Sequence, residues 1–245
     1  MTTLIPFTVP CSSNKTEIIV YDTKKENGKI IHYTDLSDID FKKNVTAVVN
    51  SLNRNDSSSN HTSTHLLHQA LRNVLGDHVE QKGSSVTSEN LRFDFSHFKK
   101  IEEQQLKEIE NFVNDKIDCS LDLIETRDED YDTAISKGAI GLFGEKYWKK
   151  VRTIKFGESY ELCGGTHVKN TLNIRNFLII SESSIASGIR RIEAISGKKS
   201  INYLSQRNSE INELKSILSS NKDTIDSVKN LKSENEKDFS FLEIK

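Results

Sequence analysis

The chain has 245 residues, of which 29% are charged and 35% are hydrophobic, and its formal net charge is −2. This length can bury a substantial core in one large domain or two modest ones. The nearly balanced charge excludes a globally basic nucleic-acid-binding protein, so any contact with RNA must come from local patches. The start of the chain lacks a basic segment and a long apolar run, and three cysteines form no paired framework. We therefore expect no signal peptide, no membrane span and a reduced, cytoplasmic protein.

Short strands are predicted over residues 1–55. Glu17–Tyr21 and Lys29–Tyr33 flank a polar turn and should form a hairpin, and Val45–Val49 is a third strand. We interpret this region as part of a β-barrel. The polar run at 53–60 is expected to be a linker into the next segment.

A helix with two histidines on one face is predicted next. His61 and His65 are four residues apart and open an apolar stripe of helical period. Asp56 and the serines at 57–59 are N-cap candidates, and Gly76 is a stop signal. The two imidazoles could form half of a metal site, or they could simply be exposed near a helix start.

A second pair with the same spacing lies about 100 residues downstream, at Cys163 and His167. Gly164 and Gly165 between them allow a tight turn. One thiolate and three imidazoles make a complete ligand set for zinc. Four protein ligands suit a structural zinc, but the count alone leaves a catalytic role open.

The middle of the chain is predicted to be α+β, with helices packed against an antiparallel sheet. Ile101–Ile117 reads as an amphipathic helix, and residues 130–137 as a short one ending at Gly138. A turn is expected at Lys82–Ser84. Strands are expected at 78–81, 91–95, within 118–126, at 151–156 and 161–162, and as a pair at 176–181 and 188–195.

From residue 200 the apolar period becomes seven, with Leu204, Ile211, Leu218 and Ile225 in one position and Leu214 and Val228 in its companion. Residues 219–223 interrupt the pattern. We predict two helices, as a hairpin or coiled coil, whose apolar residues pack on each other or on a partner. The domain boundaries expected from these patterns are 1–55, 56–198 and 199–245.

Several motifs occur together in one order. They are NHTSTHLLH at 60–68, HVEQKG at 78–83, LRFDFSH at 91–97, GLFGEKY at 141–147, ELCGGTHV at 161–168 and GIRRIE at 188–193. This string resembles the editing domain of alanyl-tRNA synthetases and their free-standing trans-editing relatives. Threonyl-tRNA synthetases have a related domain, but their second motif usually carries Pro before the His. Gly-Gly-Thr before His167 favours the alanyl branch.

The resemblance implies hydrolysis of Ser or Gly wrongly attached to tRNA(Ala), with Zn²⁺ held by His61, His65, Cys163 and His167. It also implies the fold of the threonyl/alanyl second additional domain. A synthetase pocket for alanine rejects serine or glycine by only about 1–3 kcal/mol, so a second hydrolytic site is needed. The residue matching Gln81 lies in this pocket in the family, although Gln81 could be an ordinary strand residue.

Three basic residues, Lys82, Arg190 and Arg191, are candidates for phosphates of the tRNA(Ala) acceptor end, or are solvated strand charges. The alternatives to a deacylase are a zinc-stabilised tRNA-binding module and an inactive remnant.

Two departures from the family pattern bear on the expected extent of the protein. The Gly-Gly-Gln stretch of the family's barrel is replaced by residues 7–14, and no aminoacylation or ATP-binding signature is present. We expect a fragment or reduced form of a synthetase that cannot charge tRNA alone. Its expected partners are the remaining synthetase domains or a second copy, through residues 200–232.

Overall fold

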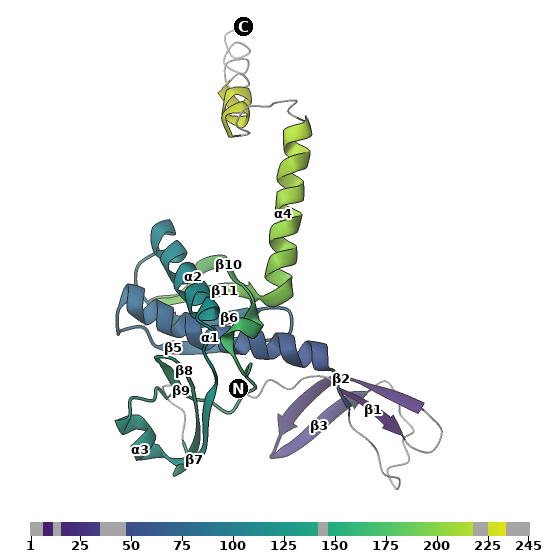
Figure 1. The fold of residues 1–245 in the computed structure, drawn as a ribbon, viewed down its shortest axis with the longest axis vertical. Coiled ribbons are helices and arrows are strands. Elements are labelled where there is room, and N and C mark those ends of the chain that lie inside the picture. Colours follow the sequence, from purple (N-terminus) through teal and green to yellow (C-terminus); the bar gives the residue numbers. More distant parts are fainter. Residues whose placement is uncertain (1–6, 12–15, 35–47, 142–146, 218–224, 234–245) are drawn as a thin grey trace. The chain divides into compact units, whose positions relative to one another are not determined.

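The computed structural model describes residues 7–11, 16–34, 48–141, 147–217 and 225–233 (Figure 1). The chain divides into two compact units, residues 1–200 and 201–245, which are described separately. The first unit is α+β with antiparallel sheets, as the sequence predicted. The predicted boundary between residues 55 and 56 falls inside a helix, Ser51–Leu75.

The first sheet is built from β1 (Phe7–Cys11), β2 (Thr16–Glu26), β3 (Lys29–Thr34) and β4 (Val48–Val49), in the order β3-β2-β1-β4. The predicted hairpin is confirmed as β2 and β3, which pair antiparallel. Asn27 and Gly28 connect the two strands with φ of 50° and 77°. A two-residue hairpin turn of type I′ requires positive φ at both of its residues. Residues 45–47 of the third predicted strand lie outside the described residues, and the barrel stays a prediction.

Helix α1 (Ser51–Leu75) is longer than predicted, and the linker expected at 53–60 is wrong. The N-cap is Asn50, whose side chain accepts a hydrogen bond from the Asn53 amide at 3.0 Å. Serine and asparagine are poor helix formers because they compete for backbone hydrogen bonds. Here tertiary hydrogen bonds occupy such a side chain, because that of Asn60 bonds to Thr87 O and Ser196 Oγ and does not compete for the helix backbone.

The C-terminal stop of α1 is confirmed. Gly76 adopts φ 114°, and its amide donates to the Arg72 carbonyl. A positive φ of this kind is accessible to glycine without a steric penalty.

The central sheet contains β5 (Gln81–Val86), β6 (Leu91–Ser96), β10 (Phe177–Ala186) and β11 (Ile189–Ser196), in the order β10-β11-β6-β5. All neighbours pair antiparallel, which confirms the pair predicted near 176–195. The turn expected at Lys82–Ser84 is wrong, because these residues lie within β5. A register shift between Gln81 and Gly83 kinks β5 there, and the chain reverses over 87–90 instead.

The hydrophobic core lies between this sheet and two helices (Figure 1). Helix α2 (Glu103–Asp118) packs on α1 and β10, while α1 contacts β5, β6 and β11. The amphipathic pattern predicted for α2 is confirmed, since Ile109, Val113 and Ile117 are buried. Leu91, Phe93 and Phe95 alternate inward from β6, also as predicted.

A smaller sheet joins β7 (Ile124–Asp130), β8 (Lys150–Phe156) and β9 (Ser159–Leu162) in the order β7-β8-β9. The predicted short helix is α3 (Tyr131–Ser136), which packs on β7 and β8. A 3-10 helix, η1 (Thr171–Ile174), follows the turn after β9 and contacts α1 and α2. This sheet therefore delivers the Cys-Gly-Gly-Thr-His turn to the main body of the unit.

The tail is helical over α4 (Gly197–Ile217), in which the boundary between the two units falls, and over 225–233. Five of the heptad residues lie among the described residues, and all five are between 46% and 63% exposed: Leu204, Ile211, Leu214, Ile225 and Val228. Burial of these residues against each other is therefore not confirmed. Leu218 lies outside the described residues, and the hairpin and a covering partner stay predictions. No helix in the described ranges is long and apolar enough to cross a membrane.

Candidate metal centre

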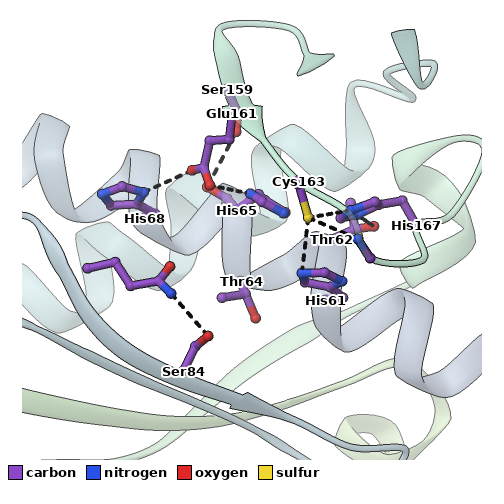
Figure 2. Close-up of polar contacts among 12 residues, drawn as sticks. His61, Thr62, Thr64, His65, His68, Ser84, Ser159, Glu161, Cys163 and His167 are labelled. Atoms are coloured by element: carbon purple, nitrogen blue, oxygen red, sulfur yellow. Dashed lines mark hydrogen bonds and ion pairs between the residues drawn. The ribbon is translucent and has the colours of Figure 1, made fainter. Parts of the chain in front are cut away.

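The two predicted ligand pairs meet between α1 and the turn after β9 (Figure 2). His61 and His65 lie one turn apart on α1, while Cys163 and His167 lie in the turn. Each residue offers one ligand atom within 4.8 Å of the other three. Folding thereby brings together residues as much as 106 positions apart in the sequence, His61 and His167.

Two of the spacings between donor atoms match those around a tetrahedral ion. Cys163 Sγ lies 3.5 Å from His61 Nε2 and 3.3 Å from His167 Nε2. Bonds of about 2.0–2.3 Å to a tetrahedral ion place neighbouring ligand atoms about 3.3–3.6 Å apart. His65 Nε2 is buried and has no hydrogen-bond partner among the described residues, so it is available to the same ion. The cluster fits a cation that accepts one thiolate and three imidazoles.

A single carboxylate orients the histidines of α1. His65 Nδ1–H donates to one oxygen of Glu161 at 2.5 Å, and His68 Nδ1–H donates to the other at 2.9 Å (Figure 2). Burial opposes ionisation of Glu161, but the two imidazoles hold its pKa well below the usual range. The carboxylate fixes the tautomer of His65 and leaves Nε2 for the ion, as in carboxylate–histidine–metal arrangements. His68 shares this carboxylate and is not one of the four residues of the cluster.

The turn that carries Cys163 is held from both sides. Thr62 Oγ1 lies 3.2 Å from His167 Nδ1 and accepts a hydrogen bond from the Val168 amide at 3.2 Å. Arg152 donates to the carbonyls of Cys163 at 3.0 Å and Gly165 at 2.6 Å. These bonds fix the turn at two carbonyls and one amide.

Glu125 holds Arg152 in place, accepting a hydrogen bond from its Nε at 2.8 Å. Arg127 also donates to this carboxylate, at 2.5 Å. The ligand turn is thus connected through Arg152 to strand β7, which carries Glu125.

Gly165 leaves the space that the His61 ring occupies. A Cβ built at this residue would lie 2.0 Å from His61 Cε1 and 2.4 Å from Nδ1. Such distances are far inside van der Waals contact. By contrast, a Cβ at Gly164 would meet nothing within 4 Å. The two glycines therefore have different roles, and the absence of a side chain at Gly165 permits His61 to reach the cluster.

The electrostatics of the cluster favour positive charge at its centre. Burial lowers the pKa of His65, but the charges of Glu161 and Cys163 outweigh burial and raise it to about 10. Burial raises the pKa of Cys163, but hydrogen bonds with His167 and His61 outweigh it and lower this pKa to about 2. Burial keeps His167 neutral, with a pKa of about 3. A thiolate and a proton thus occupy the metal-free cluster, and a divalent cation could replace the proton.

Comparisons with known proteins show which family the chain is similar to. Residues 151–193 match the family model of the threonyl and alanyl tRNA synthetase second additional domain. The alanine–tRNA ligase of Christiangramia forsetii is 51% identical over 224 residues, which cover 91% of this chain and 26% of that protein. That of Flavobacterium psychrophilum is 47% identical over 223 residues, covering 91% and 25%.

The alanine–tRNA ligase of Bacteroides thetaiotaomicron is 48% identical over 200 residues, covering 82% of this chain and 23% of that protein. The chain resembles the editing region of alanyl-tRNA synthetases. It spans about a quarter of the length of the curated relatives it matches.

Gln81, the residue that the editing-region resemblance places in the pocket, is the first residue of β5, which packs against α1. Its side chain is half-buried, and Nε2 donates to Ser84 Oγ at 3.1 Å. A register shift lies between Gln81 and Gly83 of β5. Irregularities of this kind change the direction in which the neighbouring side chains of the strand point. Its role in recognition stays a prediction.

The three basic residues proposed for phosphates in the editing region have carboxylate neighbours. Arg191 donates to both oxygens of Asp94, at 2.7 and 2.9 Å. Arg190 is 8% exposed and forms a two-point ion pair with Glu182. Lys82 donates to Glu80 at 2.8 Å. The structure therefore places these side chains in ion pairs within the chain, and their contact with tRNA stays a prediction.

Two residues that hold the cluster in place, Glu161 and Arg152, were missed in the sequence. Glu161 stands two positions before Cys163 in a buried strand, and a lone carboxylate in such a strand was the available signal. Arg152 is separated from the turn by 11 positions, and the alternation of β8 gave no sign that its side chain faces the turn.

Proposed function

We propose that this chain removes serine or glycine wrongly esterified to tRNA(Ala), using a zinc ion held by His61, His65, Cys163 and His167. The single observation that supports the proposal most strongly is the convergence of these four ligand atoms within 4.8 Å. Zinc in such a site would act as a Lewis acid, and with four protein ligands it would lower the pKa of a water only by taking it as a fifth ligand. The resemblance to alanyl-tRNA synthetases supports the substrate class.

The chain's own residues would position the site. Glu161 holds His65 in one tautomer, and Arg152 holds the turn by its carbonyls. Cys163 acts as a ligand in this proposal, which leaves it unavailable as a nucleophile. Gln81 offers two donors and an acceptor from the neighbouring strand, which suits recognition of the serine hydroxyl that alanine lacks.

The direct test is single-turnover deacylation of Ser-tRNA(Ala), with and without a chelator. We expect hydrolysis that is lost with the metal and restored by zinc. A chain that holds zinc and binds tRNA without hydrolysis would instead be a zinc-stabilised binding module, and a chain that does neither would be an inactive remnant.

Substitution of Gln81 tests the specificity pocket. One uncharged hydrogen bond contributes about 1–1.5 kcal/mol, so Gln81→Ala should slow hydrolysis of Ser-tRNA(Ala) about tenfold. Gln81→His should lose more, because its ring fills the space for the serine side chain. Gln104→His on α2, an exposed residue that bonds Glu108, is the matched control and should not change the rate. Unchanged rates in both Gln81 variants at equal zinc content would remove Gln81 from the site.

A further inference from the structure

A cavity of about 1420 Å³ lies on the outer side of the ligand turn, within the first unit. Gly164, Gly165, Thr166 and His167 form one wall. The other walls come from the first turns of α1, from β7 and β8, from η1 and from the first residues of α4. The cavity therefore adjoins the candidate metal centre without containing Gln81, Lys82, Arg190 or Arg191.

The lining is strongly basic although the whole chain is slightly acidic. It carries seven Lys or Arg side chains against three Asp or Glu side chains. The acidic ones are Asp56, Glu125 and Asp128, and Glu125 is neutralised by Arg152 and Arg127. A local excess of positive charge on a chain of net charge −2 marks a place where polyanions are attracted.

Five of these cations have no ion pair with any residue in the described ranges: Arg54, Lys150, Lys169, Arg175 and Lys198. This is the opposite of the arrangement around Arg190 and Arg191, whose charges carboxylates already satisfy. Phosphates entering the cavity would not have to displace an internal partner.

One of the five cations, Arg54, shows a feature that a bound anion would explain. Arg54 Nε is buried, and the described part of the chain offers it no hydrogen-bond partner. A buried donor of this kind is costly unless a ligand satisfies it. Arg175 is exposed and lines the cavity.

We propose that this cavity binds the phosphates of the single-stranded 3′ end of the RNA substrate and leads that end to the metal centre. The inference rests on the proposed function for the choice of RNA. The volume exceeds the about 300–1,000 Å³ typical of small-molecule pockets, and charge dominates its wall. A basic groove that follows the backbone is the usual means of holding single strands. His167 at one end of the wall places the strand's terminus at the cluster.

Binding of uncharged RNA tests the groove without requiring hydrolysis. The probe is a fluorescent single-stranded RNA of about eight nucleotides ending in cytidine-cytidine-adenosine, a length within the range such grooves hold. Affinity is measured over a series of salt concentrations for the full chain and for the triple variant Lys169→Gln, Arg175→Gln, Lys198→Gln. Each lost phosphate contact lowers the slope of log affinity against log salt by about 0.7, so the triple variant should lose about two from its slope.

The matched control is the triple variant Lys99→Gln, Lys100→Gln, Lys107→Gln, which removes the same charge from exposed residues at and before α2. It should keep the wild-type slope. An unchanged slope in the groove variant would overturn the proposal, and so would equal losses in both variants, since binding would then reflect diffuse charge. Zinc content and circular dichroism establish that both variants are folded. A chain that passes this test yet fails to deacylate would refute the proposed hydrolysis and leave the groove established.

Discussion

Gly165→Ala isolates the contribution of one ligand without touching any ligand side chain. The new methyl group would lie 2.0 Å from His61 Cε1 and 2.4 Å from Nδ1. Ordinary contact begins near 3.4 Å, so the ring or the turn must move by about 1.4 Å. Metal–ligand distances tolerate only about 0.2 Å. Arg152 holds the Gly165 carbonyl at 2.6 Å, and α1 is packed in the core, so neither side can yield freely.

The expected magnitude follows from the share that one ligand contributes. Structural zinc sites bind with about 10–16 kcal/mol, so an equal share for one of four ligands is about 2.5–4 kcal/mol. Loss of His61 from the cluster should therefore weaken zinc about 10²–10³-fold. Competition against a chelator of known affinity measures this change, and far-UV circular dichroism reports whether the fold remains.

Gly164→Ala is the control, because its methyl group meets nothing within 4 Å. It should bind zinc as wild type does. The double variant Gly165→Ala with His61→Ala should be no weaker than His61→Ala alone, since both changes remove the same ligand. Full zinc affinity in Gly165→Ala would show that His61 does not bind the metal in this orientation, and additive losses would show that Gly165 acts through something else.

Further changes test other parts of the argument. Glu161→Gln should lower zinc affinity about 10–100-fold, because an amide cannot accept hydrogen bonds from both His65 and His68. The control Glu158→Gln, in the β8–β9 turn, should leave zinc affinity unchanged. Equal zinc affinities in the two variants would exclude the orienting role of Glu161. The Arg152 and Arg127 guanidinium groups outweigh partial burial and lower the pKa of Glu125 from 4.5 to about 2, so the stability this group contributes is present above pH 4.5 and lost as pH falls toward 2. Denaturant titrations of the metal-free chain should therefore show a weaker loss of stability over this range in Arg152→Met than in wild type, and identical acid slopes would contradict the pairing. If a second copy covers the exposed residues of α4, Ile211→Lys with Leu214→Lys should reduce self-association in sedimentation velocity, and a wild-type chain that stays monomeric at all concentrations would exclude self-pairing.

The four residues of the cluster could be predicted from the sequence because their spacing matches local geometry. Four residues is one helical turn for His61 and His65, and two glycines allow the bend between Cys163 and His167. Glu161 and Arg152 could not be assigned in this way. Their roles depend on which side chains face the cluster after β8, β9 and α1 have packed, and no local period contains that information.

The errors of the sequence reading have the same origin. Serine favours caps and turns, yet α1 continues through three of them, Ser57, Ser58 and Ser59. These serines are buried in the fold, and Ser58 Oγ donates a hydrogen bond to the Arg54 carbonyl. Lys82–Ser84 carry turn residues, yet pairing with β6 makes them a strand with a bulge. The heptads of the tail specify an apolar stripe on a helix, but the sequence holds no information about what covers it.

The shared carboxylate of Glu161 has a consequence for how the protein can be observed. His68 does not reach the cluster, and its ring lies 5.4 Å from that of Phe93 in the central sheet. Any change of charge at His65 alters the electron density on Glu161 and so the proton that His68 shares with it. The ring resonances of His68 in a nuclear magnetic resonance spectrum should therefore shift with metal occupancy. They would report metal binding from a buried residue that is not itself one of the four residues of the cluster.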